Sequence, residues 1–149
     1  MKSRRVLLLV FTLMVGTVGL SQTSGALRQK YGPPDHSGRY VVRPGIGMTV
    51  RVDGAGVTRD IAISPIESAA SSTRRSSKTA PTMKADLAKA ILYEVVPVSR
   101  RGRYKGTGNA EFGCTSVDHM EYENAIISIT NRCDEQGGGT YSVQVHWKK

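Results

Sequence analysis

Three residue types that cooperate in nucleophilic catalysis occur close together in this chain, as Ser116, Asp118 and His119. Neighbouring residues of an extended chain point to opposite sides, so Asp118 and His119 are not expected to form a proton relay. The chain also lacks the Gly-x-Ser-x-Gly turn that exposes a serine nucleophile in many hydrolases. Residues of these types are common in turns, and we therefore assign no catalytic residue here.

Glu121 and Glu123 are two residues apart and would share one face of a strand. Glycoside hydrolysis needs two carboxyl groups held across a cleft, whereas adjacent acids at a strand start are typical of a solvated edge. His119 with these acids, or His146, could contact a metal ion, but no complete ligand set is evident. We expect no metal and no cofactor, and a small hydrolase using these residues is the least favoured hypothesis.

A group of basic residues lies within six positions and contains Arg100, Arg101, Arg103 and Lys105. Residues 100–108 also contain glycines, but they lack the Walker ending of a phosphate-binding loop, and no helix is expected to follow. We therefore predict a basic loop. If its side chains converge with other cations, they would attract polyanions such as lipid head groups or glycans, with nucleic acid a less natural target for an exported protein. A merely solvated surface is the simpler interpretation.

The two cysteines, Cys114 and Cys133, are predicted to form a disulfide. A disulfide is the default state for a cysteine pair in an exported protein. Closing a loop of about 20 residues would stabilise the fold by about 3 kcal/mol. The alternative is a metal pair, which is disfavoured because the thiols lack CxxC spacing.

The first 26 residues have the pattern of a secretory signal peptide. Residues 1–5 carry three basic side chains, residues 6–20 carry no charge, and Ser24-Gly25-Ala26 offers small residues at a cleavage site. The apolar run is shorter than the roughly 18–20 residues of a membrane-spanning helix. We predict cleavage after Ala26, with Ser21 as a second choice and an uncleaved anchor as the alternative. The protein is then periplasmic or extracellular, with no membrane span.

The remaining chain divides into two units. Its 39% hydrophobic content supports a core, and the net charge of +9 does not by itself indicate a nucleic-acid partner. Residues 27–67 are predicted as a short helix followed by a meander of about three strands, at 39–42, 48–53 and 57–64. Residues 68–81 are rich in serine and contain no large apolar side chain, which predicts a mobile linker.

Residues 82–149 are predicted as a helix followed by antiparallel strands. Apolar residues four apart indicate a helix over 82–96 that begins at Thr82 and stops at Pro97, although 91–96 could instead continue as a strand. Strands are expected at 110–117, 123–130 and, most clearly, 141–147, where apolar and polar residues alternate and Trp147 belongs to the core face.

The predicted fold is therefore α+β. It has an antiparallel sheet, or sheets, of about six short strands, one long and one short helix, and one disulfide. Each half is a helix followed by about three strands, and whether the halves form one domain or two stays open.

The helix exit Tyr31-Gly32-Pro33-Pro34, followed by a strand meander, resembles the small periplasmic lipoproteins that assist outer-membrane assembly. The resemblance covers only the first unit and implies its fold. The lipid-attachment cysteine of that family has no counterpart here, and no functional residue is transferred.

We predict a small secreted module that is not an enzyme and that binds a protein or a cell-envelope component. Small size, export, a disulfide and the lack of a catalytic constellation motivate this prediction. The binding surface would be a sheet edge, to which a partner could add a strand, or the loops at 100–108 and 134–139.

Overall fold

The computed structural model describes residues 24–66, 81–133 and 138–148. Most of the predicted signal peptide and of the serine-rich linker lies outside the described residues. The predicted cleavage site after Ala26 falls within the first described helix.

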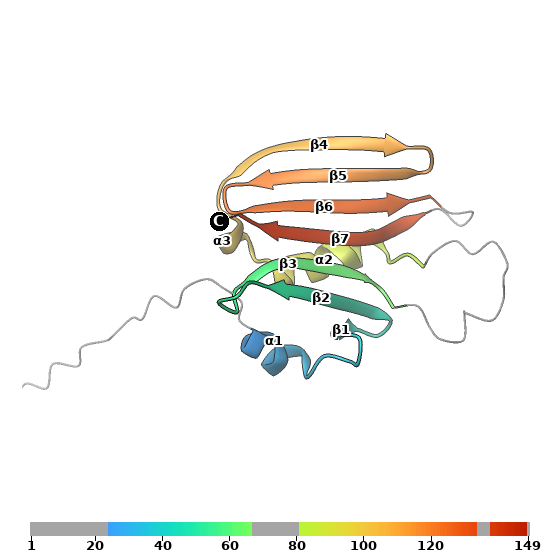
Figure 1. Ribbon diagram of the computed structural model, residues 1–149. Helices are drawn as coiled ribbons and strands as arrows, with labels where there is room; N and C mark the ends of the chain where they lie inside the picture. Colours follow the sequence, from blue (N-terminus) through green and yellow to red (C-terminus); the bar gives the residue numbers. More distant parts are fainter. Residues whose placement is uncertain (1–23, 67–80, 134–137, 149) are drawn as a thin grey trace, which may run out of the picture.

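The centre of the fold is one antiparallel sheet of seven strands in the order β1-β2-β3-β7-β6-β5-β4 (Figure 1). The first three strands are β1 (Arg39–Arg43), β2 (Ile46–Val52) and β3 (Thr58–Pro65). The other four are β4 (Tyr104–Phe112), β5 (Thr115–Tyr122), β6 (Ala125–Arg132) and β7 (Gly139–Trp147). The two halves join where β3 pairs with β7, so a single sheet runs through both predicted units.

Three helices complete the described structure: α1 (Ser24–Tyr31), α2 (Ala85–Val95) and α3 (Val98–Arg101). The apolar face of α2 presents Ala88, Ile91, Leu92 and Val95, whose spacing places them on one side of the helix. These residues join Leu27 of α1 and the buried strand residues in one core. Pro97 follows α2 and prevents its continuation.

One row of paired residues shows how the buried face of the sheet changes character. Met48, Ile63, Val143 and Ile129 lie side by side on β2, β3, β7 and β6 and are all buried. The same row continues to Asp118 on β5 and Asn109 on β4. Along this row the buried apolar residues therefore end at β6, and the row continues through β5 and β4 with polar residues.

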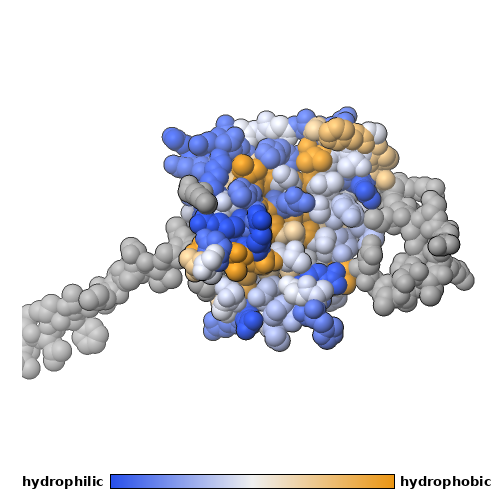
Figure 2. Space-filling model, viewed as in Figure 1, coloured by the Kyte–Doolittle hydropathy of each residue, from blue (hydrophilic) through white to orange (hydrophobic). Residues whose placement is uncertain are grey.

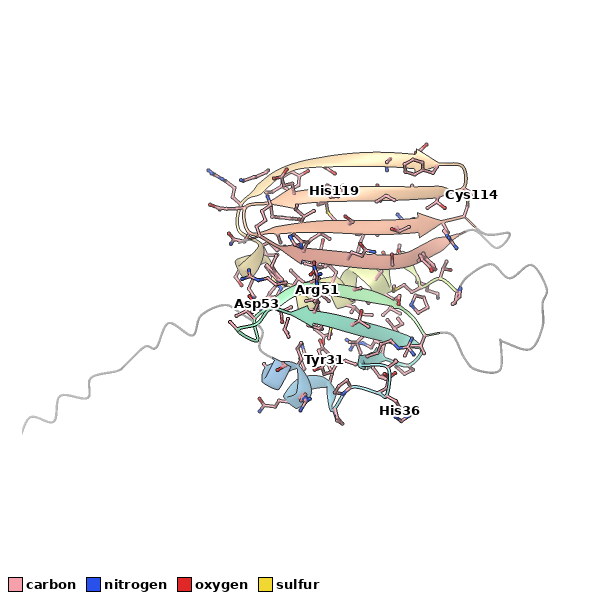
Figure 3. All side chains as sticks on the ribbon, in the orientation of Figure 1. Tyr31, His36, Arg51, Asp53, Cys114 and His119 are labelled. Carbon is pink, nitrogen blue, oxygen red and sulfur yellow. A yellow bond between two sulfur atoms is a disulfide. The ribbon has the colours of Figure 1, made fainter. Side chains whose placement is uncertain are left out.

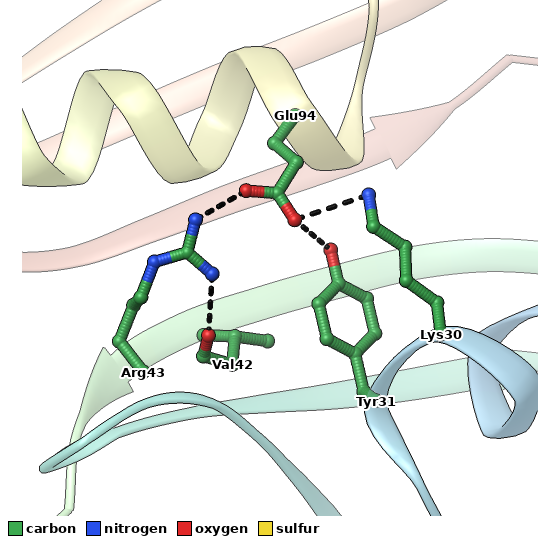
Figure 4. A network of polar contacts seen from close by, with 5 residues as sticks. All are labelled: Lys30, Tyr31, Val42, Arg43 and Glu94. Atoms are coloured by element: carbon green, nitrogen blue, oxygen red, sulfur yellow. Dashed lines mark hydrogen bonds and ion pairs between the residues drawn. The ribbon is translucent and has the colours of Figure 1, made fainter.

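A carboxylate from α2 ties both α1 and β1 to the rest of the fold (Figure 4). Glu94 accepts a hydrogen bond from the Tyr31 hydroxyl at 3.0 Å and pairs with Lys30 at 3.0 Å and with Arg43. Hydrogen bonding from Lys30, and then from Arg43 and Tyr31, lowers the pKa of Glu94 to about 2. Glu94 therefore stays ionised in the folded protein under all but strongly acidic conditions.

The structure confirms the α+β class and corrects the element count, which is seven strands and three helices. The expected loop at 100–108 is divided between α3 and the start of β4. The expected strand at 110–117 is interrupted by a two-residue turn at Gly113 and Cys114, between Phe112 and Thr115. Gly113 has φ +58° and Cys114 has negative φ, the pattern of a type II′ hairpin turn.

The long helix begins later than Thr82 because the residues before it join the sheet. The Met83 N–H donates to the Thr140 carbonyl at 2.8 Å, and the Thr140 N–H donates back at 2.9 Å. At Gly139, an added Cβ would lie 2.8 Å from the Thr82 hydroxyl oxygen, so the close approach of this segment requires glycine. Helix α2 then starts at Ala85.

The structure places the two cysteines of the predicted disulfide within disulfide distance of each other. The Cα atoms of Cys114 and Cys133 are 5.4 Å apart, within the normal range for a disulfide, and the two residues are bonded. Cys114 lies in the β4–β5 turn (Figure 3), and Cys133 directly follows β6.

Trp147, which was expected on the core face of the last strand, is only half-buried and packs against the core rather than within it.

Candidate functional site

The most unusual surface of the molecule is the free edge formed by β4. Every residue of β4 except Gly106 is exposed, including Tyr104 at 52% and Phe112 at 71%. In the described part of the chain, β4 pairs with β5 alone, and no element lies on its other side (Figure 1). Such an edge can accept a further strand, because one row of backbone groups faces outward.

The pairing of β5 shows which residues of β4 direct their backbone groups outward, because alternate residues of β5 hydrogen-bond to β6 on one side and to β4 on the other. The Cys133 N–H donates to the Cys114 carbonyl at 3.0 Å, so the Cys114 carbonyl faces β6. Alternate residues of a strand face opposite sides, which turns the backbone of Thr115, Val117 and His119 toward β4. Consistent with this, the His119 carbonyl accepts the Thr107 hydroxyl at 2.9 Å.

Phe112, Ala110 and Gly108 lie opposite those three β5 residues and direct their backbone groups inward. The intervening residues, Glu111, Asn109 and Thr107, therefore direct their N–H and C=O groups outward. A register shift between Tyr104 and Gly106 ends the regular pairing, so the open edge comprises residues 106–112.

The opposite edge of the sheet, at β1, is protected. The carbonyl of Arg39 accepts the Asp35 N–H at 2.7 Å, and the N–H of Arg39 donates to the Asp35 carboxylate at 3.0 Å. The guanidinium of Arg43 donates to the Val42 carbonyl at 2.7 Å. A short strand, a register irregularity and two arginines add to this protection. The two edges therefore differ in their capacity to pair.

A groove of about 560 Å³, lined by both polar and apolar residues, lies beside β4, between α2 and the ends of β4, β5 and β6. In the wall of this groove, the Asp118 carboxylate accepts hydrogen bonds from the side-chain amides of Asn109 at 2.7 Å and Asn131 at 3.1 Å. Asn131 in turn accepts the hydroxyl of buried Thr140 at 3.0 Å. Glu111 also lines the groove, so a strand added at β4 would place alternate side chains beside it.

The four basic residues predicted as a polyanion contact do not form one surface. Arg101 is only 3% exposed, donates to the Val96 carbonyl at 2.8 Å and lies over the Tyr93 ring at 4.7 Å. Arg100 is half-buried with its guanidinium 5.3 Å from the Trp147 ring, and burial lowers its pKa. Only Arg103 and Lys105 are exposed.

The residues considered for hydrolysis are separated or paired elsewhere. Asp118 faces the groove, whereas the adjacent His119 lies on the other face of the sheet, where it is 2.9 Å from the Ser128 hydroxyl (Figure 3). Glu121 forms an ion pair with Lys148 at 2.6 Å, which lowers the pKa of Glu121. Glu123 accepts the Arg103 N–H at 3.3 Å. These contacts do not assemble a catalytic group.

Within residues 24–66, 81–133 and 138–148, no helix is long and apolar enough to cross a membrane. These residues also contain no group of three or more His, Cys, Asp or Glu residues that could hold a metal ion.

Comparison with known proteins found no match among family models, curated proteins or solved structures. The resemblance of residues 27–67 to the outer-membrane assembly lipoproteins therefore stays a prediction.

Sequence reasoning considered a sheet edge as a binding surface but did not identify β4 as that edge. The signal that could have located it is the turn, since Gly113-Cys114 sits between Phe112 and Thr115 with glycine at the first turn position. A hairpin centred there assigns residues before Gly113 to a strand.

Proposed function

We propose that this protein is a small exported binding module, without enzymatic activity, that binds a partner protein by accepting an extended segment of it along β4. The observation that carries this proposal is the open edge over residues 106–112, where three residues direct their backbone groups outward and nothing described pairs with them. Main-chain hydrogen bonds supply affinity in strand addition, and flanking side chains supply selectivity. The disulfide supports export, because such bonds persist in oxidising compartments.

The basic surface supports a weaker alternative. A polyanion site needs several cations that are exposed on one face, and burial removes Arg101 from that set. The open edge is a continuous surface of defined chemistry, and we therefore place the interaction there.

The proposal is tested by comparing a variant that loses one outward N–H group with a control variant that loses the same side chain but keeps that N–H. Glu111→Pro eliminates the N–H of a residue whose backbone faces outward, and proline is tolerated at such edge positions. Glu111→Ala is the matched control, because it removes the same side chain and keeps the N–H. Both variants should retain the circular dichroism spectrum of the original protein and nearly its melting temperature.

The measurement is retention of a partner from envelope extract at high salt by the immobilised protein. We expect one protein to be retained by the original chain and by Glu111→Ala, and lost with Glu111→Pro. Equal retention by both variants would refute strand addition at β4, and retention that disappears at high salt for all three would favour the polyanion alternative.

A further inference from the structure

We propose that the segment added to β4 is β4 of a second copy of this chain, paired antiparallel about a two-fold axis at Asn109. This inference rests on the proposed function and specifies its partner. It follows from the length of the open edge, from the side chains on its uncovered face and from the distribution of charge.

The position of the two-fold axis follows from the length of the open edge, because two antiparallel copies pair over its full length only when the axis passes its central residue. The regular segment runs from Gly106, where the register shift ends, to Phe112, where the turn begins, and its central residue is Asn109. Pairing about Asn109 places Thr107 opposite Glu111 of the second copy and Asn109 opposite its own counterpart. All three residues face outward, so each of these pairs can exchange two backbone hydrogen bonds.

The side chains on the face of the sheet away from the helices are complementary in this register. Phe112, which is 71% exposed, would lie opposite Gly106 of the second copy and diagonal to its Gly108. An added Cβ at either glycine meets nothing within 4 Å, so the backbone there is uncovered. An aromatic side chain over a strand glycine fills such a gap. Figure 2 shows the hydrophobic patch at this end of β4, at the upper right.

The charged residues of β4 do not oppose pairing between two copies of this strand. Glu111 is the only charged residue between 106 and 112, and in this register it faces neutral Thr107 of the second copy. Arg103 and Lys105 lie before the regular segment. No pair of like charges is therefore directly opposed across the axis, which is the condition that would otherwise prevent pairing.

The pair of Thr107 and Glu111 gives a test that depends on the register. Thr107→Lys places an ammonium group opposite Glu111 of the second copy, at two sites in each dimer, and Thr107→Glu places a carboxylate there. Thr107→Gln is the neutral control of similar length. Thr107→Glu combined with Glu111→Lys restores opposite charges in the paired register.

The assay is sedimentation equilibrium of the purified protein from about 1 µM to about 1 mM, because an interface of one strand pair is small and association is expected to be weak. Relative to Thr107→Gln, we expect Thr107→Lys to lower the dimer Kd by about 2- to 30-fold and Thr107→Glu to raise it by a similar factor. The double variant should return to the range of the control.

Two results would overturn the inference. A protein that stays monomeric throughout this range refutes self-pairing. A dimer whose Kd responds equally to all Thr107 substitutions refutes this register. If sedimentation gives either result while Glu111→Pro still loses a partner that Glu111→Ala retains, strand addition at β4 stands and only the identity of the partner is wrong. If the retention comparison also shows no effect of the N–H, both proposals are wrong.

Discussion

Replacing Glu94 with glutamine is expected to destabilise the fold in a way that depends on pH. Hydrogen bonding, chiefly from Lys30, lowers the pKa of Glu94 from its usual 4.5 to about 2. A difference of this size corresponds to an upper limit of about 3 kcal/mol. The Glu94 side chain is 28% exposed and that of Lys30 is 46% exposed, so solvent screening reduces our expectation to about 1–2 kcal/mol.

The direction of the pH effect follows from the lowered pKa. Because the folded pKa lies below the unfolded one, this stabilisation is complete above about pH 5 and is lost as the pH falls toward 2. The difference in unfolding free energy between the original protein and Glu94→Gln should therefore shrink below pH 5. At pH 3 it should be less than half of its value at pH 7.

The assay is urea unfolding followed by the fluorescence of Trp147, the single tryptophan, at pH 7, 5 and 3. Glu111→Gln is the control for removing one negative charge, since Glu111 is exposed and lies on β4, at the edge of the sheet opposite β1. Comparison at each pH cancels the contribution of other carboxylates with low pKa values, such as Asp35. A destabilisation by Glu94→Gln that is the same at pH 7 and pH 3 would refute the assignment of this energy to the ionised carboxylate.

Two further predictions concern the disulfide at Cys114 and the side chain of Arg101, which flank β4 in the sequence. Replacing Cys114 and Cys133 together with serine should cost about 3 kcal/mol in urea unfolding by the loop-closure model. Reductant should destabilise the original protein and leave the double variant unaffected. An unchanged midpoint in the double variant would contradict this. Arg101→Met should cost about 2–4 kcal/mol because it leaves the buried Val96 carbonyl without its donor, whereas Arg103→Ala should stay within about 0.5 kcal/mol. Similar costs for the two arginines would contradict the buried position of Arg101.

The sequence was informative where buried and exposed residues alternate or recur at helical spacing. Val143 and Val145 of β7 are buried while Gln144 and His146 are exposed, and the pattern predicted this strand almost to its ends. The buried face of α2 follows in the same way from its apolar spacing. In these elements the core selects the residue types, so the residue types reveal the core.

The pattern was uninformative where the sheet extends beyond its core. Strand β4 contains Gly106 and Gly108, has no buried residue, and owes its conformation to pairing with β5. Glycine has low strand propensity, so local sequence favoured a loop. Asp118 in β5 was similarly interpreted as a turn residue, because its partners Asn109 and Asn131 come from neighbouring strands.

The group of basic residues shows a different limit. Arg100, Arg101 and Arg103 lie within four positions of the sequence, but α3 ends at Arg101, and the φ of +74° at the following Gly102 changes the direction of the chain. Arg101 consequently points inward over Tyr93, while Arg103 is left in solvent. Charge density along a sequence does not predict charge density on a surface when a turn lies within the group.

The difference between the two sheet edges determines what kind of assembly β4 can form. If β1 were open as well, β4 of one copy could pair with β1 of the next, and such head-to-tail pairing continues without limit into a filament. The Asp35 and Arg43 contacts occupy backbone groups of Arg39 and Val42 on β1, which disfavours that route. Self-pairing through β4 uses the same edge from both copies and stops at two. The register shift before Gly106 limits the contact to seven residues, which favours a reversible dimer over a permanent one.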